Sequence, residues 1–256
     1  MTGAEARRRL KEATGRGVRV AVVDSGWSAS SEDPRVMPVV EPGGADEAGL
    51  PGDAVGHGTW CALRVLQVAP EAEIVPVRVF RDRLETSVPL LYEAIQTART
   101  TGARVINLSL ATHRADAIHP LYEVCERARR DGVVVVAAAH NRGGRAVPAY
   151  LEPVLSVGHG PHTELLEFTY EADAAIECTA ASGGVPCPGV DGRPIRRGGS
   201  STAAATLSGI VARLLEVAPG DLDHVRHLLS LTATPLRPAG PSLGSRVEMR
   251  KGGKVT

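Results

Sequence analysis

Net charge is the first property that this sequence lacks. Its 256 residues include 29 lysines and arginines and 29 aspartates and glutamates, so the formal net charge at pH 7 is zero. Without an overall field, the protein has no long-range means of attracting nucleic acid, an anionic membrane or an acidic substrate. Aromatic residues make up only 3% of the chain, and no basic patch interleaved with aromatic side chains marks a nucleic-acid interface. We therefore expect no nucleic-acid partner, and local recognition of whatever the protein binds.

Long hydrophobic runs are missing as well. The longest uninterrupted apolar run, Val133 to Ala139, has seven residues, whereas a membrane-spanning helix needs roughly 18 or more. The amino terminus carries charges but no apolar stretch behind them and no small-residue cleavage site, so it does not resemble a signal peptide. These absences predict a cytoplasmic protein that makes no membrane contact.

Cysteine occurs at only four positions, Cys61, Cys125, Cys178 and Cys187. No two of them have the CxxC spacing of a zinc site, and four are too few for a disulfide scaffold. We expect them to be mostly reduced, with Cys178 and Cys187 close enough in sequence to pair only if the protein is exported. A glycine-rich phosphate loop is also missing. The sequence predicts neither a cofactor nor a required metal.

What the sequence does contain is an alternation of short, nearly continuous β-branched runs with longer amphipathic stretches. This alternation is typical of a parallel sheet covered by helices. We predict an α/β fold in one domain spanning 1–256, with a helical extension at 1–16 and a tail at 236–256. Two stretches rich in glycine and proline, 41–56 and 181–199, are predicted to be loops. The predicted strands are 18–23, 73–80, 104–110, 132–139 and 154–157, and the predicted helices are 4–13, 59–68, 89–100, 121–131, 201–217 and 222–232.

Two polar residues lie where a fold of this kind binds its ligands. Asp24 ends the run Val-Arg-Val-Ala-Val-Val at a turn, and in an open parallel sheet that end of a strand faces the ligand crevice. His57 lies between Gly56 and Gly58 at the head of a predicted helix, and histidine is the commonest general base near neutral pH. Taken alone, Asp24 is more often a turn residue or helix cap, and His57 is as often a loop histidine.

Ser201 and Asn141 likewise each allow a structural and a functional interpretation. Ser201 follows two glycines and a serine at the start of a helix of small residues. A serine there is usually an N-cap, but the helix dipole and backbone N–H groups also favour the charge that develops when a serine attacks a carbonyl. Asn141 is one of only two asparagines and follows a buried strand, where an amide is costly unless it is paired. An amide donor at that place could hold an oxyanion.

Four blocks of the sequence resemble the signature motifs of the subtilisin-like serine proteases. Their order along the chain, Asp then His then Ser, is the subtilisin order and differs from the orders of chymotrypsin-like enzymes and α/β-hydrolases. Supporting segments at 104–110 and 154–158 fall in register, so the similarity covers roughly residues 17–235. The blocks are Asp24-Ser25-Gly26, His57-Gly58-Thr59, Ala138-Ala139-His140-Asn141 and Gly199-Ser200-Ser201-Thr202-Ala203.

The resemblance implies a three-layer αβα sandwich with a central, mostly parallel sheet, and a role for each matching residue. Ser201 would be the nucleophile, His57 the general acid and base, and Asp24 the carboxylate that orients the imidazole. Asn141 and the N–H of Ser201 would form the oxyanion hole. A peptide or protein substrate in an extended conformation would pair with the backbone by strand addition. The residues implied in substrate binding are Ser109, Leu110, Ala111, Ala138, Ala139 and His140.

The chain departs from the family at several positions. It has Gly-Ser-Ser-Thr-Ala-Ala-Ala at 199–205, where most relatives have Gly-Thr-Ser-Met-Ala-Ala-Pro. We assign Ser201 rather than Ser200 because Ser201 keeps the two-residue offset from the glycine. His140 replaces a glycine along the primary specificity pocket, so we expect a narrower or more polar pocket and a selective enzyme. Cys61, near the histidine, is interpreted as a small buried hydrophobic residue.

Three functions follow from these observations. The leading hypothesis is a serine endopeptidase that forms an acyl-enzyme on Ser201. A second enzyme with the same first step would resolve the acyl-enzyme with an amine, as a transpeptidase or macrocyclase in peptide maturation. The third is a non-catalytic scaffold that kept the fold and binds a partner peptide.

Overall fold

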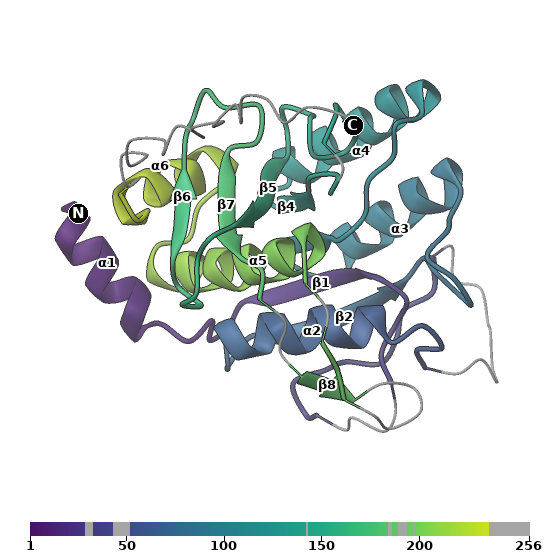
Figure 1. Ribbon diagram of the computed structural model, residues 1–256, viewed down its shortest axis with the longest axis horizontal. Helices are drawn as coiled ribbons and strands as arrows, with labels where there is room; N and C mark the ends of the chain where they lie inside the picture. Colours follow the sequence, from purple (N-terminus) through teal and green to yellow (C-terminus); the bar gives the residue numbers. More distant parts are fainter. Residues whose placement is uncertain are drawn as a thin grey trace, which may run out of the picture.

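The computed structural model describes residues 1–28, 33–42, 52–141, 143–183, 186–188, 194–196 and 198–235. In this part of the chain, a seven-stranded sheet of order β2-β1-β3-β4-β5-β7-β6 has helices on both faces (Figure 1). Neighbouring strands are parallel except β6, which is antiparallel to β7. The predicted α/β class and the three layers are confirmed. The strands are β1 (Arg19–Asp24), β2 (Glu73–Arg78), β3 (Val105–Leu108), β4 (Val134–Ala138), β5 (Leu155–Gly160), β6 (Phe168–Tyr170) and β7 (Cys178–Ala181).

Each face of the sheet has its own apolar core. Along β1, Val20 and Val22 belong to one core, while Ala21 and Val23 belong to the other. The first core includes side chains of α1, α2, α5 and α6, and the second those of α3 and α4. Burial on both faces explains why the strands are apolar almost throughout. The helices are α1 (Gly3–Glu12), α2 (His57–Val68), α3 (Val88–Thr100), α4 (Ile118–Arg130), α5 (Ser200–Val217) and α6 (Leu222–Thr232), with a 3-10 turn at Ala115–Ala117 before α4.

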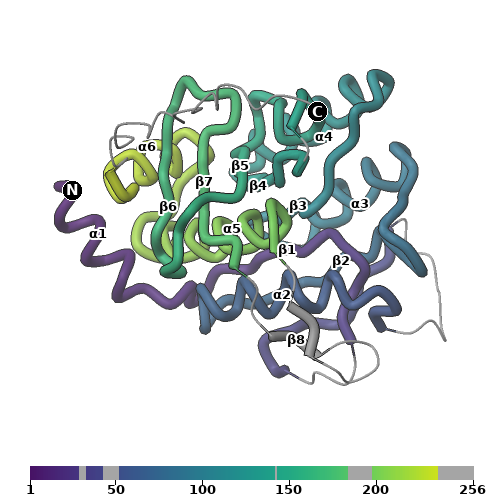
Figure 2. Tube along the Cα trace, in the orientation of Figure 1, coloured from purple at the N-terminus to yellow at the C-terminus, as the bar shows by residue number. Residues whose placement is uncertain are grey.

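The predicted helix at the amino terminus packs onto the body of the protein. α1 buries Ala6 and Leu10 and lies beside α6 (Figure 2). At their contact, the Arg7 guanidinium donates a hydrogen bond of 3.4 Å to the carbonyl of Ala233. Among the described helices, none alone is long and apolar enough to cross a membrane; α5 and α6 meet those criteria only together, across a bend of 100°.

The structure corrects the predicted loop at 181–199 and adds two strands to the sheet. The loop contains the last residue of β7 and a small antiparallel pair, β8 (Pro186–Pro188) and β9 (Pro194–Arg196). Proline holds three of the six positions in that pair, and proline counts against a strand because it cannot donate to a ladder. β6 and β7 were missed because three or four residues are too short to show a periodicity. Most of the other predicted loop and the tail at 236–256 lie outside the described residues.

Three of the four cysteines, Cys61, Cys125 and Cys178, are buried free thiols. The fourth, Cys187, has a side chain outside the described part of the structure. Burial raises the pKa of both the Cys125 and the Cys178 thiols, to about 12 for Cys125. The expectation of reduced cysteines therefore agrees with the three described thiols.

The carboxyl ends of the central strands form the edge where polar residues gather. β1 ends at Asp24, β3 ends just before Ser109, and β4 ends three residues before Asn141. α2 and α5 both begin at this edge, since His57 contacts Asp24 and Ser201 contacts Ser109. Because parallel strands all end at the same edge, the topology alone brings together residues that are far apart in the sequence.

A buried ion pair ties α6 to the opposite edge of the sheet. Arg226 Nε lies 2.8 Å from Oε1 of Glu177, the residue before β7. The same guanidinium donates to the carbonyl of Glu152 at 2.9 Å, in the segment that leads into β5. The backbone N–H of Glu177 in turn donates to the Ser156 hydroxyl at 2.9 Å. Arg226 thus joins a helix, a strand and a connecting segment through one group.

We expect Arg226→Ala to lower the free energy of unfolding by about 3 kcal/mol, because it leaves a buried carboxylate unpaired. Glu177 is only 9% exposed. Urea denaturation measures the loss. The matched control is Arg8→Ala, which removes an ion pair whose side chains are 61% and 60% exposed and should cost less than about 0.5 kcal/mol. Equal losses in the two variants would contradict the assignment.

Candidate active site

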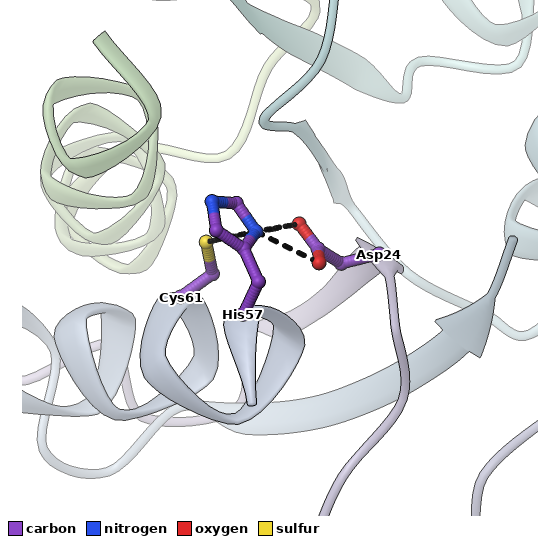
Figure 3. A group of neighbouring side chains, drawn as sticks. All are labelled: Asp24, His57 and Cys61. Atoms are coloured by element: carbon purple, nitrogen blue, oxygen red, sulfur yellow. Dashed lines mark hydrogen bonds and ion pairs between the residues drawn. The ribbon is translucent and has the colours of Figure 1, made fainter. Parts of the chain in front are cut away.

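Asp24 and His57 form a buried pair at the carboxyl end of β1. The two carboxylate oxygens of Asp24 lie 2.9 and 2.8 Å from His57 Nδ1 (Figure 3). A carboxylate can only accept, so Nδ1 carries the hydrogen and Nε2, which points away from Asp24 (Figure 3), is left as the basic nitrogen. Asp24 Oδ1 also accepts the backbone N–H of Ser25 at 2.8 Å. The tautomer with the hydrogen on Nδ1 and a free lone pair on Nε2 is the one that a general base needs.

His57 reaches Asp24 because glycine lets α2 approach the turn after β1. A Cβ atom on Gly58 would lie 2.4 Å from the carbonyl oxygen of Gly26 and 3.0 Å from the backbone nitrogen of Ser25. Gly56, before α2, has a φ of 72°, in the left-handed region that favours glycine. The N–H of Gly58 donates to the Ser25 hydroxyl at 2.8 Å. The close contact between two backbones therefore requires glycine at position 58, and the left-handed backbone favours glycine at position 56.

The first turn of α2 depends on a residue that sequence reasoning missed. Oδ1 of Asp53 accepts the N–H groups of Val55 and Gly56, and its Oδ2 accepts the N–H and the hydroxyl of Thr59 at 2.8 and 2.7 Å. Asp53 therefore satisfies N–H groups that a helix start leaves unpaired. The signal was present in the sequence, since an Asp lies three residues before Gly56, but it fell inside a stretch interpreted only as loop.

The pKa of His57 is raised above that of a free histidine. Burial by itself lowers this pKa, but the Cys61 sulfur and the Asp24 carboxylate raise it, and their effect prevails. We attribute the raised pKa of His57 to the Asp24 carboxylate, because a negative charge in direct contact with the ring favours the imidazolium. Below its pKa the imidazole holds a proton and cannot accept another. A reaction that needs His57 as a base should therefore rise with pH, with a midpoint above about 6.5.

We expect a pH titration of His57, followed by NMR of the imidazole, to show a midpoint above about 6.5. In Asp24→Asn the midpoint should fall by about one to three pH units, because the charge that favours the imidazolium is gone. His57→Ala assigns the signal. Asp223→Asn, on the exposed face of α6, is the control and should leave the midpoint unchanged. An unchanged midpoint in Asp24→Asn would show that the carboxylate does not set the pKa.

Ser201 is the second residue of α5 and lies at the same edge. Its hydroxyl donates to the backbone carbonyl of Ser109 at 3.2 Å. Among the described contacts of Ser201, none joins its hydroxyl to His57. Both side chains nevertheless line one cavity of about 400 Å³. The structure thus brings the predicted nucleophile and base to one cavity, with the hydroxyl turned toward β3.

A buried polar network fixes the backbone of Ser201. The Ser109 hydroxyl donates to the carbonyl of Ser201 at 3.1 Å and accepts from Nδ2 of Asn107 at 3.0 Å. Oδ1 of Asn107 accepts from the hydroxyl of Ser208, about two turns further along α5, at 3.1 Å. Asn107 is thus paired on both sides, which is how a fully buried amide is tolerated. The network ties the start of α5 to the end of β3.

Asn141 extends from the end of β4 to the start of α5. Its Oδ1 accepts the backbone N–H of Ser200 at 3.0 Å and would lie 3.0 Å from a Cβ atom on Gly199. The N–H of Ser201 belongs to the same first turn, where N–H groups have no partner within the helix. The structure therefore brings the predicted oxyanion donors together beside Ser201. In the observed conformation the amide oxygen, and not its nitrogen, contacts the helix.

The cavity beside His57 and Ser201 contains half of the predicted substrate-binding residues. Ser109, Leu110 and Ala111 line it. The lining also includes the apolar residues Phe80, Leu84, Val88 and Leu91 and the charged residues Glu85 and Arg114. Ala138, Ala139 and His140 belong to the neighbouring strand end and do not line this cavity. The two strand ends lie side by side, because β3 and β4 are paired in parallel register.

Cys61 lies one helical turn after His57, beneath the pair. Its sulfur is 3.8 Å from both Asp24 Oδ2 and His57 Nδ1, and the three ligand atoms lie within 4.8 Å of one another (Figure 3). Such a set of donors can hold a metal ion. Burial, however, raises the pKa of the Cys61 thiol, and metals bind the thiolate. The burial agrees with the interpretation of Cys61 as a small hydrophobic residue, and the absence of a required metal stays a prediction.

The chain is similar to known proteins over most of its length. It is 31% identical over 308 aligned positions to mycosin-1 of Mycobacterium tuberculosis, covering 90% of this chain and 66% of mycosin-1. It is 28% identical to subtilisin DY of Bacillus licheniformis, covering 87% and 85% of the two chains. Among solved structures, a lanthipeptide protease superposes with a TM-score of 0.72 at 21% identity, covering 93% of this chain and 87% of that one. At that identity the likeness concerns the fold alone.

A family model gives the same result with definite bounds. The model of the subtilase family, Peptidase_S8, matches residues 15–246. This range contains the four motifs and every candidate residue described above. The chain belongs to the subtilase family of serine proteases.

Proposed function

We propose that the protein is a serine endopeptidase that cleaves a peptide bond through an acyl-enzyme on Ser201. One observation carries the proposal: Asp24 holds His57 in the tautomer of a base, and His57 and Ser201 line one cavity. An aspartate that only caps a helix and a histidine that only lies in a loop do not need this arrangement. The non-catalytic scaffold is disfavoured, because all four residues of the machinery are present and lie at one edge of the sheet.

The proposed reaction begins with a proton transfer. His57 Nε2 takes the hydroxyl proton of Ser201 while Oγ bonds to the carbonyl carbon, and the carbonyl electron pair moves onto oxygen. The N–H of Ser201 and Nδ2 of Asn141, after a turn of its side chain, donate to that oxyanion. The intermediate then collapses: the C–N bond breaks and the imidazolium gives its proton to the leaving amine. Water repeats the sequence and releases the acid.

The contact between the Ser201 hydroxyl and the Ser109 carbonyl suggests how substrate engages the nucleophile. An extended peptide that pairs with residues 109–111 offers its own N–H groups to the carbonyls of that segment. Occupation of the Ser109 carbonyl by a peptide N–H would release the hydroxyl to turn toward His57. Hydrogen bonds in such sites are often loose without substrate and tighten in the complex.

The substrate that we propose is a peptide or protein of narrow sequence. His140 supports this choice, since a ring stands where relatives carry a glycine. The fold of a lanthipeptide protease supports a substrate that is a precursor peptide. An amine could replace water in the second half of the reaction, and the mass of the product separates hydrolysis from such a transfer.

A serine-directed fluorophosphonate should label the purified protein at Ser201, as peptide mapping can show. Labelling should vanish in Ser201→Ala and in His57→Ala, because the first lacks the nucleophile and the second lacks the base. Ser200→Ala is the matched control: it removes the neighbouring hydroxyl but keeps the N–H that contacts Asn141. Labelling lost in Ser200→Ala and retained in Ser201→Ala would overturn the assignment. An unlabelled wild-type protein would favour the scaffold.

Asn141→Ala should lower kcat for a cleaved peptide by about 100- to 1000-fold, the cost of losing one oxyanion-hole donor in subtilisin, with a smaller effect on KM. Steady-state kinetics on a quenched fluorescent peptide measure both. Thermal denaturation serves as the control, because Asn141 is exposed and its loss should leave the midpoint nearly unchanged. A lower midpoint with unchanged kcat would make Asn141 a structural cap and not an oxyanion donor.

A further inference from the structure

Three side chains with metal-binding atoms meet at the Nδ1 side of the His57 ring. His57 Nδ1 lies 2.8 Å from Oδ2 of Asp24, and the Cys61 sulfur lies 3.8 Å from each of these two atoms (Figure 3). A point at equal distance from the three atoms is about 2 Å from each, close to the bonds of zinc to nitrogen, oxygen and sulfur, which are roughly 2.0 to 2.3 Å long. The spacing of the three atoms therefore fits a zinc ion.

The charges of these side chains also suit a divalent cation. Asp24 and Cys61 are fully buried, and a buried ion is tolerated only where opposite charges surround it. The Asp24 carboxylate supplies one negative charge, and the Cys61 thiol supplies the second when it loses its proton on coordinating the metal. The Ser109 hydroxyl, 3.4 Å from the sulfur, does not depend on the thiol proton, because its oxygen also accepts from Asn107. A zinc ion with these ligands would be neutral overall.

A zinc ion at this place would reverse the tautomer of His57. The ion takes the lone pair of Nδ1, so the hydrogen that Nδ1 donates to Asp24 moves to Nε2 and the imidazole stays neutral. The proton of the Cys61 thiol leaves to solvent. Nε2 then carries a hydrogen and has no lone pair for the Ser201 hydroxyl, so the proposed base is lost. The ion lies at Nδ1, whereas the proposed reaction takes place at Nε2.

We propose that Asp24, His57 and Cys61 form an inhibitory zinc site that inactivates the base and leaves the substrate cavity open. Zinc should bind reversibly and more weakly than a resident cofactor, because a buried thiol must lose its proton and the hydrogen bonds between Asp24 and His57 must break. Of the three residues, only His57 lines the cavity that contains Ser201, so we expect the ion to enter past this ring. The effect on activity rests on the proposed endopeptidase function, and the binding itself does not.

Zinc ions equilibrated with the protein before a quenched fluorescent peptide is added should lower kcat and leave KM nearly unchanged, because the base is lost while substrate still binds. A chelator should restore the rate. Cys61→Ala and Cys61→Ser should each raise the zinc concentration for half inhibition by at least about 10-fold, since losing even an outer-shell partner costs a metal site about 10- to 100-fold. Cys125→Ala removes another buried thiol and is the matched control, which zinc should inhibit like the wild type. Each rate is compared with that of the same variant in chelator.

A second measurement needs no substrate. Cobalt ions occupy zinc sites and absorb light through a bond to thiolate sulfur, so they should give an absorption band with the wild type and with Cys125→Ala. The band should be absent in Cys61→Ser and weaker in Asp24→Asn, which lacks the charge of one ligand. Zinc ions should displace the cobalt and remove the band.

Three results would overturn the inference and leave the endopeptidase function standing: a cobalt band that persists in Cys61→Ser, zinc inhibition of equal strength in Cys61→Ala and the wild type, or zinc that raises KM alone. An absent band together with no inhibition by zinc would have the same meaning. If no peptide is cleaved, the endopeptidase function fails, and the cobalt band still decides whether the three side chains bind the metal.

Discussion

The approach of α2 to the turn after β1 is the constraint on which the candidate active site depends. Gly58 packs against the backbone of Ser25 and Gly26 so closely that no side chain fits between them. This contact sets His57 against the Asp24 carboxylate and buries both. Burial in turn removes the water that would weaken their interaction. The backbone contact therefore comes first, and the tautomer and raised pKa of His57 follow from it.

Ser201, the proposed nucleophile, is positioned by polar groups inside the core. Asn107 and Ser109 connect the end of β3 to the first turns of α5, and each donor and acceptor in the chain from Ser208 to Ser201 has a partner. A satisfied buried network has few alternative arrangements, so it holds the backbone of Ser201 firmly. The Ser201 hydroxyl has one described hydrogen bond, to the carbonyl of Ser109. A fixed backbone with a hydroxyl that can turn is suited to a nucleophile that engages when substrate arrives.

Stabilising and functional contacts lie at opposite edges of the same sheet. The Arg226–Glu177 pair secures the amino ends of β5 and β7, while the candidate catalytic residues lie at the carboxyl ends of β1, β3 and β4. The segment between β4 and β5 runs from one edge to the other and contains Val147, which pairs with Thr112. This pairing ties the connection after β4 to the segment that follows β3.

The sequence by itself determined the layered fold and the family, and it predicted Asp24, His57, Asn141 and Ser201 as candidate site residues. These depend on local information: apolar runs show buried strands, glycines mark the turns, and the motifs keep their order and spacing. Asp53 caps α2 through local contacts and was missed because its stretch was interpreted only as loop. Only the tertiary structure decided that Arg226 pairs with Glu177 and that the Ser201 hydroxyl points to Ser109. The sequence also did not predict the proline-rich pair β8 and β9, because each of these short strands forms only by pairing with the other. The contacts of Arg226 and of the Ser201 hydroxyl join segments that come together only when the sheet and its helices have assembled, so no local pattern records them.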